Sequence, residues 1–157
     1  MRPITAADVM NPRVLAAAAD WTLPELADFL VEHEISGAPV VDAAGRLLGV
    51  ASVTDIAAAL STEGGEGAPG ADFFQSAWPE GPSREALAAL AARGVRLTVR
   101  EIMTPRVYTV VEDTPVGELA ETLIEKHVHR LLVTREEKVV GIVSTGDLLG
   151  LLIEEEE

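Results

Sequence analysis

The interpretation of this chain starts from two stretches, Gly49-Val50-Ala51-Ser52-Val53-Thr54-Asp55 and Gly141-Ile142-Val143-Ser144-Thr145-Gly146-Asp147. Each begins with a short apolar run, which is typical of a strand covered on both faces. Each continues with a serine and, three residues later, an aspartate, which is the spacing of a helix N-terminus. The sequence therefore predicts, twice, a buried strand that leads directly into a helix.

The serine and the aspartate of these stretches have two interpretations. A helix N-terminus offers unpaired N–H groups and a partial positive charge, which suit a phosphate. The serine hydroxyl adds a donor, and the carboxylate can accept hydrogen bonds from the cis hydroxyls of a ribose. The alternative is that Ser52 with Asp55, and Ser144 with Asp147, only cap their helices. One copy alone favours the cap, whereas two copies inside a longer repeat favour a ligand.

The two stretches close the copies of an internal repeat, residues 8–60 and 101–152. The alignment begins with Asp8-Val9-Met10-Asn11-Pro12-Arg13-Val14 against Glu101-Ile102-Met103-Thr104-Pro105-Arg106-Val107, and it needs a one-residue deletion in the turn at Asp42 to Arg46. Two copies are too few for a solenoid, so we expect a pseudo-twofold pair. The expected organisation is repeat 1 (1–60), an insert with a short helix (61–98), repeat 2 (99–153) and an acidic tail (154–157).

Within each copy the pattern predicts strand, helix, strand, strand, helix, an α/β (α+β) fold. Thr22 with Glu25 forms a capping box for the first long helix, and in the second copy Thr114 is the expected cap with Pro115 at the first helical position. The other expected elements are strands 38–41, 47–52, 131–134 and 139–144 and closing helices 55–60 and 147–153. In the insert, Ser61 to Gly70 reads as a loop and Ser83 to Arg93 as a helix. The aromatic stretch Phe73 to Trp78 is expected to dock on the core, or to form a subunit contact or a lid.

Composition excludes several classes of function. The 157 residues carry a net charge of −14, which argues against binding to nucleic acid or to an anionic membrane surface. With 48 % hydrophobic residues the chain is globular, and without cysteine it has no disulfide or thiol chemistry. No apolar run reaches the ~20 residues of a membrane span, and the N-terminus lacks the apolar core of a signal peptide. We therefore expect a cytoplasmic location.

The repeat resembles a tandem pair of CBS domains, also called a Bateman module. The residues that carry the resemblance are Met10-Asn11-Pro12, Met103-Thr104-Pro105, the two Gly-to-Asp stretches and Val128-His129-Arg130-Leu131-Leu132-Val133. The resemblance implies two β-α-β-β-α repeats packed into one module. It also implies a regulatory role, with an adenosine-containing ligand (AMP, ADP or ATP, with S-adenosylmethionine as an alternative) in clefts between the repeats.

The resemblance also assigns roles to individual residues. Asp55 and Asp147 would hold ribose hydroxyls, Ser52 and Ser144 would contact phosphate, and the backbone at Val14 and Val107 would border the adenine. His129 and Arg130 match a pair that reaches ligand phosphates in related proteins, where arginine offers a bidentate fork. The first repeat has Ser36 and Gly37 there, so we expect inequivalent sites. Which Ser/Asp pair lies beside His129 and Arg130 stays open at this point.

Three functions follow from these observations. The first is a nucleotide sensor that forms a homodimer and signals to an effector protein not visible in the sequence. The second is an interaction or dimerisation module that binds no small ligand. The third, an enzyme, is disfavoured because no serine has a neighbouring His/Asp relay. A metal site is disfavoured too, since His127 and His129 lack a third ligand.

Overall fold

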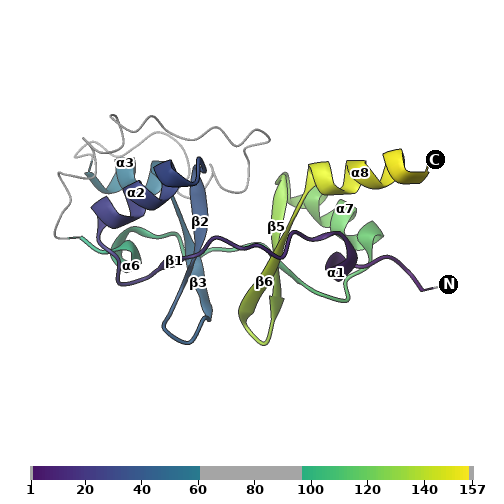
Figure 1. Cartoon of the computed structure of the whole chain (residues 1–157), viewed down its shortest axis with the longest axis horizontal. Coiled ribbons are helices and arrows are strands. Elements are labelled where there is room, and N and C mark those ends of the chain that lie inside the picture. The colour runs from purple at the N-terminus through teal and green to yellow at the C-terminus, as the bar shows by residue number, and fades with distance from the viewer. Residues whose placement is uncertain (1, 61–96, 156–157) are drawn as a thin grey trace. The chain divides into compact units, whose positions relative to one another are not determined.

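The computed structural model of the chain describes residues 2–60 and 97–155 (Figure 1). The chain divides into two compact units. Unit 1 consists of Met1–Val14 with Tyr108–Glu157, and unit 2 consists of Leu15–Val107. Each unit thus takes its closing Ser-x-x-Asp stretch from one repeat and its Met-x-Pro stretch from the other. The repeat boundaries expected from the sequence stay a prediction.

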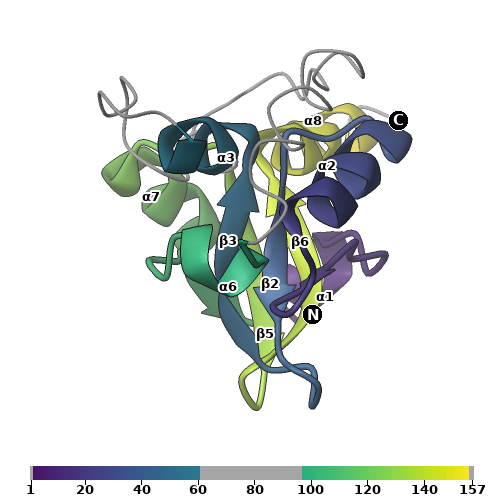
Figure 2. The ribbon, with the colours of Figure 1, turned by 90° about the vertical axis from the view of Figure 1, so that its left-hand side faces the viewer.

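Unit 2 is built on a three-stranded sheet of order β1-β2-β3, with β1 (Ala17–Ala18), β2 (Gly37–Val41) and β3 (Leu47–Ser52). β1 runs parallel to β2, and β2 runs antiparallel to β3. Helix α2 (Leu23–Glu32) connects β1 to β2, α3 (Val53–Leu60) follows β3 without a break, and α6 (Val99–Ile102) comes later in the chain. Figure 2 shows β3 leading into α3 at one end of the sheet and the β2–β3 turn at the other.

Helix α2 forms where the sequence predicts it. Thr22 Oγ1 accepts a hydrogen bond from Glu25 N (3.4 Å), while the Glu25 carboxylate accepts one from Thr22 N (3.2 Å). This reciprocal capping box satisfies two N–H groups that the first turn leaves unpaired. The apolar stripe of the helix is buried in the unit's core, and it comprises Leu23, Leu26, Ala27 and Leu30.

Unit 1 repeats the plan with a sheet of order β4-β5-β6. Its strands are β4 (Thr109–Val111), β5 (Arg130–Arg135) and β6 (Lys138–Ser144), and its helices are α1 (Ala6–Val9), α7 (Val116–Lys126) and α8 (Thr145–Glu155). β4 is parallel to β5, and β5 is antiparallel to β6. The predicted order of elements is confirmed in both copies, and the structure adds the four-residue helices α1 and α6.

The start of α7 differs from the prediction. Pro115, not Thr114, is the N-cap, and its carbonyl accepts the first helical hydrogen bonds, from Glu118 N (3.0 Å) and Leu119 N (3.1 Å). The Thr114 carbonyl is already used, because it accepts a hydrogen bond from Ala6 N (2.8 Å) of the N-terminal segment. A tertiary contact therefore moves the helix start by one residue. The loop, aromatic stretch and helix expected in the insert lie outside the described residues.

A Met-x-Pro segment runs antiparallel to the last strand of each sheet. Asn11 and Ile142 exchange two backbone hydrogen bonds of 2.8 and 3.0 Å in unit 1, and Thr104 and Val50 exchange two of 2.8 and 2.9 Å in unit 2. The glycine before each strand end permits this approach. A Cβ on Gly49 would lie 2.4 Å from the carbonyl oxygen of Thr104, and one on Gly141 would lie 2.3 Å from Met10 Sδ.

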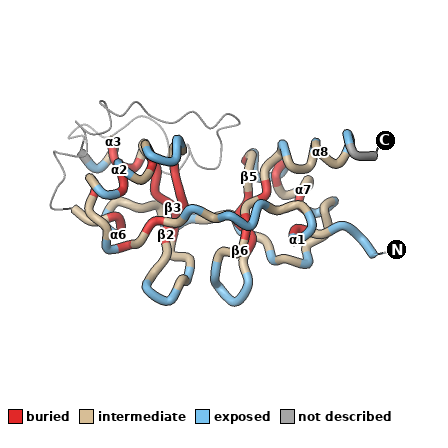
Figure 3. The backbone as a smooth tube through the Cα atoms, viewed as in Figure 1, coloured by how far each residue is buried: buried red, intermediate tan, exposed pale blue. Residues whose placement is uncertain are grey.

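Burial follows the strands and the helix faces turned toward them, while the hairpin turns are exposed (Figure 3). The turn between β5 and β6 holds only Glu136 and Glu137, both with positive φ (50° and 70°). A two-residue turn with both φ values positive has the pattern of type I′, which fits the twist of a hairpin. The longer turn in unit 2 places Gly45 at φ 87° instead. The one-residue deletion inferred from the repeat lies in this hairpin turn.

Candidate functional site

The serine and aspartate of each closing stretch form a capping box. In unit 2, Asp55 Oδ2 accepts hydrogen bonds from Ser52 N (2.9 Å) and Ser52 Oγ (3.1 Å), and Asp55 N donates to Ser52 Oγ (3.3 Å). In unit 1 the corresponding distances between Ser144 and Asp147 are 2.8, 3.0 and 3.2 Å. One carboxylate oxygen of each aspartate is therefore committed to starting its helix, and only the other oxygen is left for further contacts.

The second oxygen has a different environment in the two units. Thr104 Oγ1 donates a 2.8 Å hydrogen bond to Asp55 Oδ1, and Asp55 is 1 % exposed. Asp147 is only partly buried, and its Oδ1 accepts no hydrogen bond from residues 2–60 or 97–155. Because a carboxylate oxygen with an unused lone pair at a helix N-terminus can accept a hydrogen bond from a hydroxyl group, Asp147 is the aspartate that can take a new partner.

The difference goes with the residue at one position of the paired Met-x-Pro segment. Thr104 and Asn11 occupy the same backbone position, each bridged to the last strand of its sheet. Thr104 directs its hydroxyl to Asp55, whereas the exposed Asn11 uses Oδ1 to accept a hydrogen bond from Arg13 N (3.0 Å). Sequence reasoning treated both residues only as parts of a motif. The signal that it passed over was that the two copies differ at this position.

Arg130 lies in unit 1 with Ser144 and Asp147. It is the register partner of Ser144 across β5 and β6, so the two side chains lie on the same face of the sheet. Arg130 is partly buried, and this desolvation lowers the pKa of its guanidinium from the ordinary value. Arg130 therefore lies beside Ser144 within unit 1, while the Ser/Asp pair with which it shares a ligand site stays a prediction. In unit 2, Gly37 stands opposite Ser52.

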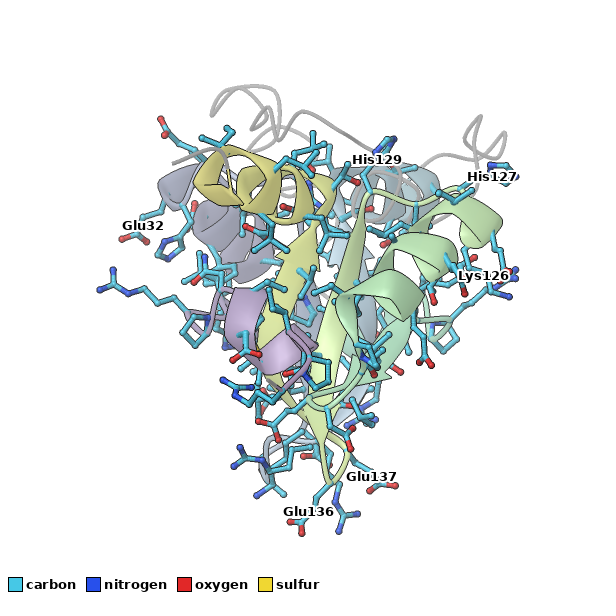
Figure 4. All side chains as sticks on the ribbon, turned by 90° about the vertical axis from the view of Figure 1, so that its right-hand side faces the viewer. Glu32, Lys126, His127, His129, Glu136 and Glu137 are labelled. Atoms are coloured by element: carbon cyan, nitrogen blue, oxygen red, sulfur yellow. The ribbon has the colours of Figure 1, made fainter. Side chains whose placement is uncertain are left out.

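His129 has a different environment from Arg130. Its carbonyl accepts hydrogen bonds from Thr145 N (2.9 Å) and Thr145 Oγ1 (3.3 Å). The residue His129 also lines a largely apolar groove of about 520 Å³ between α7 and α8. His127 ends α7 in the left-handed conformation (φ 55°) and lines the same groove. Figure 4 shows both histidines at the end of the sheet opposite Glu136 and Glu137. The remaining lining residues are Ala120, Leu123, Ile124, Val128, Thr145, Leu148 and Leu149.

The two predicted valines divide between the units. Val14 is part of unit 1 with Ser144 and Asp147, and Val107 is part of unit 2 with Ser52 and Asp55. Both side chains are partly buried. Within residues 2–60 and 97–155, no group of three or more His, Asp or Glu residues is placed to hold a metal ion. In the same part of the chain, no helix has both the length and the apolar character needed to cross a bilayer.

Comparison with known proteins bears on this arrangement. The sequence model of the CBS domain matches residues 6–62 and again residues 99–154. The chain belongs to the CBS domain family. Its two matched segments correspond to the two repeats, so it carries a tandem pair of CBS domains, as the resemblance implied.

Curated relatives extend the match over most of the chain. The CBS domain-containing protein CBSX1, chloroplastic, of Arabidopsis thaliana is 30 % identical over 129 residues, which is 82 % of this chain and 54 % of that protein. The L-aspartate semialdehyde sulfurtransferase of Methanocaldococcus jannaschii is 27 % identical over 151 residues, 95 % of this chain but 23 % of that protein. The chain thus spans about half of the first relative and about a quarter of the second.

Solved structures share the fold of the CBS pair. CBSX2 of Arabidopsis thaliana in complex with AMP has a TM-score of 0.67 at 24 % identity, with 98 % of each chain covered. The CBS domain pair of protein MJ0100, in complex with 5′-methylthioadenosine and S-adenosyl-L-methionine, has a TM-score of 0.64 at 24 % identity, covering 98 % of this chain and 99 % of that one. At this identity the likeness establishes the fold.

Proposed function

We propose that this CBS pair is a regulatory module that binds an adenosine-containing ligand at Asp147 in unit 1 and passes the ligand state to a partner protein. The observation that carries the proposal is the Oδ1 atom of Asp147, which no described residue uses, next to Ser144 and Arg130. The CBSX2 structure with AMP and the MJ0100 structure with S-adenosyl-L-methionine support the ligand class.

The residues of the site suit the parts of a nucleotide. Asp147 Oδ1 accepts hydrogen bonds from ribose hydroxyls, and hydrogen bonds to an ionised carboxylate are stronger than those between neutral groups. The N-terminus of α8 favours a phosphate group, to which the Ser144 hydroxyl would donate in place of Asp147 Oδ2. The Arg130 guanidinium supplies a positive charge and up to two parallel donors. Val14, from the paired segment, would border the base. His129 would approach the phosphates from the end of β5.

AMP, ADP and ATP differ from S-adenosylmethionine in the charge that they bring. The nucleotides carry anionic phosphates, whereas S-adenosylmethionine carries a sulfonium cation and an amino-acid group. Partial burial of Arg130 favours an anionic partner, because a desolvated guanidinium gains more from a phosphate than an exposed one does. We therefore rank AMP, ADP and ATP ahead of S-adenosylmethionine.

Titration calorimetry with AMP, ADP, ATP and S-adenosylmethionine tests the proposal. Wild type should bind at least one of them, and Asp147→Asn should weaken that binding at least tenfold. Glu118→Gln, which changes an exposed carboxylate in the first turn of α7, is the matched control and should bind like wild type. If none of the four ligands binds at millimolar concentration, the proposal is overturned.

A second candidate function is an interaction module that dimerises without a small ligand. Helices α7 and α8 present large apolar side chains to solvent, among them Ile124 (73 % exposed), Leu152 (60 %) and Ile153 (69 %). These side chains lie on the helices that line the groove, so the same face offers protrusions and a recess, which suits isologous pairing with a second copy. Ile124→Glu should convert a dimer to a monomer in sedimentation equilibrium. A wild-type monomer at high concentration contradicts this function.

Both functions are non-catalytic and leave the effector to be identified. The cytoplasmic location and the signalling partner remain predictions from the sequence. Pull-down of an effector in the presence and absence of the bound ligand would test the regulatory part, because a ligand shifts an equilibrium only by its differential affinity for the two states.

A further inference from the structure

The two Ser-x-x-Asp motifs have the same serine and aspartate in the sequence. In the structure, however, the hydrogen bonds of the two carboxylates differ. We propose that the Thr104 hydroxyl occupies the Asp55 carboxylate oxygen that a ligand would need. The motif of unit 2 is then purely structural, and the chain binds a single adenosyl ligand. This inference rests on the proposed function for its ligand part. Its structural part concerns one hydrogen bond, from Thr104 Oγ1 to Asp55 Oδ1, and can be tested without any ligand.

Asp55 uses both of its carboxylate oxygens within the fold. Its Oδ2 accepts two hydrogen bonds from Ser52 and its Oδ1 accepts one from Thr104, in a residue that is 1 % exposed. A ribose hydroxyl would have to displace the Thr104 hydroxyl from a position it holds by the fold. The exchange would trade an intramolecular bond for an intermolecular one of similar strength, at the additional cost of ordering the ligand.

Thr104 is fixed in place by the backbone of β3. Its backbone exchanges hydrogen bonds of 2.8 and 2.9 Å with Val50. Its carbonyl oxygen lies so close to Gly49 that even a Cβ there would be only 2.4 Å away. The two hydrogen bonds with Val50 and the close approach to Gly49 thus hold the segment against β3. Its backbone has little room to move the hydroxyl away from Asp55.

Unit 1 has different residues at the two corresponding positions. Asn11 stands at the position of Thr104, but its side chain binds Arg13 N and leaves Asp147 Oδ1 unoccupied by described residues. Opposite the serine, unit 1 has Arg130 where unit 2 has Gly37. Opposite its serine, unit 2 therefore has no guanidinium, and its aspartate has no carboxylate oxygen available for a ligand. Both differences favour unit 1 as the ligand-binding unit.

The ligand part is tested by titration calorimetry with the nucleotide that binds wild type. The expected stoichiometry is one ligand per chain. Asp55→Asn should bind within about threefold of wild type, Asp147→Asn should lose at least tenfold, and Asn11→Thr, which places a threonine hydroxyl beside Asp147, should also lose at least tenfold. Two ligands per chain, one of them lost in Asp55→Asn, would overturn the inference and leave the proposed function intact.

The structural part is tested by thermal melts without ligand. Thr104→Val replaces the hydroxyl with a methyl group and should lower Tm by about 3 °C or more, because the buried Asp55 carboxylate loses the hydrogen bond that Thr104 Oγ1 donates. Thr104→Ser should recover most of that loss. Thr54→Val is the matched control, since the Thr54 hydroxyl makes no hydrogen bond with the described residues, and Tm should stay within about 1 °C.

The two experiments separate the possible failures. If no adenosyl ligand binds wild type but Thr104→Val lowers Tm, the proposed function fails and the role of Thr104 in holding Asp55 is supported. If Thr104→Val melts like wild type, Thr104 does not hold Asp55 and the inference is overturned whatever binds.

Discussion

Arg130 and Ser144 face each other across the antiparallel strands β5 and β6 of unit 1. The pair sits where β6 ends and α8 begins, so a guanidinium, a hydroxyl and a helix N-terminus are assembled within one hairpin and the helix that follows it. No residue of the other repeat's sheet is needed for this part of the arrangement.

Replacing Arg130 should separate phosphate-bearing ligands from S-adenosylmethionine. Arg130→Met keeps the apolar stem and removes the charge, and it should weaken AMP, ADP or ATP binding at least tenfold, about 1.4 kcal/mol or more. Arg135→Met is the control, because Arg135 lies at the other end of β5 and pairs with Glu112 instead. The measurement is titration calorimetry. Equal losses for the nucleotides and S-adenosylmethionine would show that Arg130 acts on stability and not on phosphate.

Alanine at the two close-approach glycines should destabilise the chain to different extents. A Cβ at Gly49 would meet a backbone oxygen of Thr104, whereas one at Gly141 would meet the flexible side chain of Met10. We expect Gly49→Ala to cost about 3 kcal/mol in the free energy of unfolding and Gly141→Ala about 1 kcal/mol. Gly150→Ala, where nothing lies within 4 Å, should instead stabilise α8 by about 0.5–1 kcal/mol.

Urea denaturation of the three alanine variants measures these changes. The ordering of Gly49 and Gly141 is the discriminating result, since it depends on whether the neighbouring atom belongs to backbone or to a movable side chain. A smaller loss for Gly49→Ala than for Gly141→Ala would contradict the close approach of Thr104 to β3.

The β5–β6 turn should gain stability from residues that tolerate positive φ. Glu136 and Glu137 adopt φ values of 50° and 70°, a region that costs an ordinary L-residue about 1–2 kcal/mol. The double change Glu136→Asn with Glu137→Gly should raise the free energy of unfolding by about 1 kcal/mol, after the added flexibility of glycine in the unfolded chain is counted. Glu121→Gly, in the middle of α7, should lower it by about 1 kcal/mol. Urea midpoints of both variants provide the comparison.

Acid should weaken the N-terminal segment through Asp8. The hydrogen bonds from the Arg2 guanidinium (2.9 and 2.8 Å) are the largest cause that lowers the pKa of Asp8 from 3.8 to about 2. Because the folded-state pKa is the lower one, this contribution is present above about pH 4 and is lost as the pH falls toward 2. Arg2→Gln should flatten the fall in Tm over that window, whereas Arg13→Gln should not. An unchanged pH profile for Arg2→Gln would contradict the role of the pair.

The local parts of the fold were accessible from the sequence because local physics determines them. The capping boxes at Thr22 and Ser52 and the two hairpins depend on residues within a few positions of each other, and the structure has them as predicted. The short helices α1 and α6 were overlooked, although Thr5 with Asp8 and Thr98 with Glu101 form capping boxes of the same kind. Four residues offer too little periodicity to reveal a helix.

What the sequence could not reveal depends on contacts between distant segments. A repeat pattern does not say which strand end a Met-x-Pro segment joins, so the pairing of Asn11 with Ile142 and of Thr104 with Val50 needed the structure. The same holds for the hydrogen bond from Thr104 to Asp55, and for the use of the Thr114 carbonyl by Ala6, which moved the start of α7. The inequivalence of the two aspartates follows entirely from such contacts.

The division of unit 1 between the two ends of the chain has a consequence for synthesis. Residues 15–107 form unit 2 as one continuous stretch, so that unit can be completed while the ribosome is still making the rest. Residues 1–14 leave the ribosome before unit 2, but their partners in β6 and α7 are made after it. Closing a loop of that span makes unit 1 the high-contact-order half of the molecule. A segment that is synthesised before unit 2 therefore finds its partners only after unit 2 has been made.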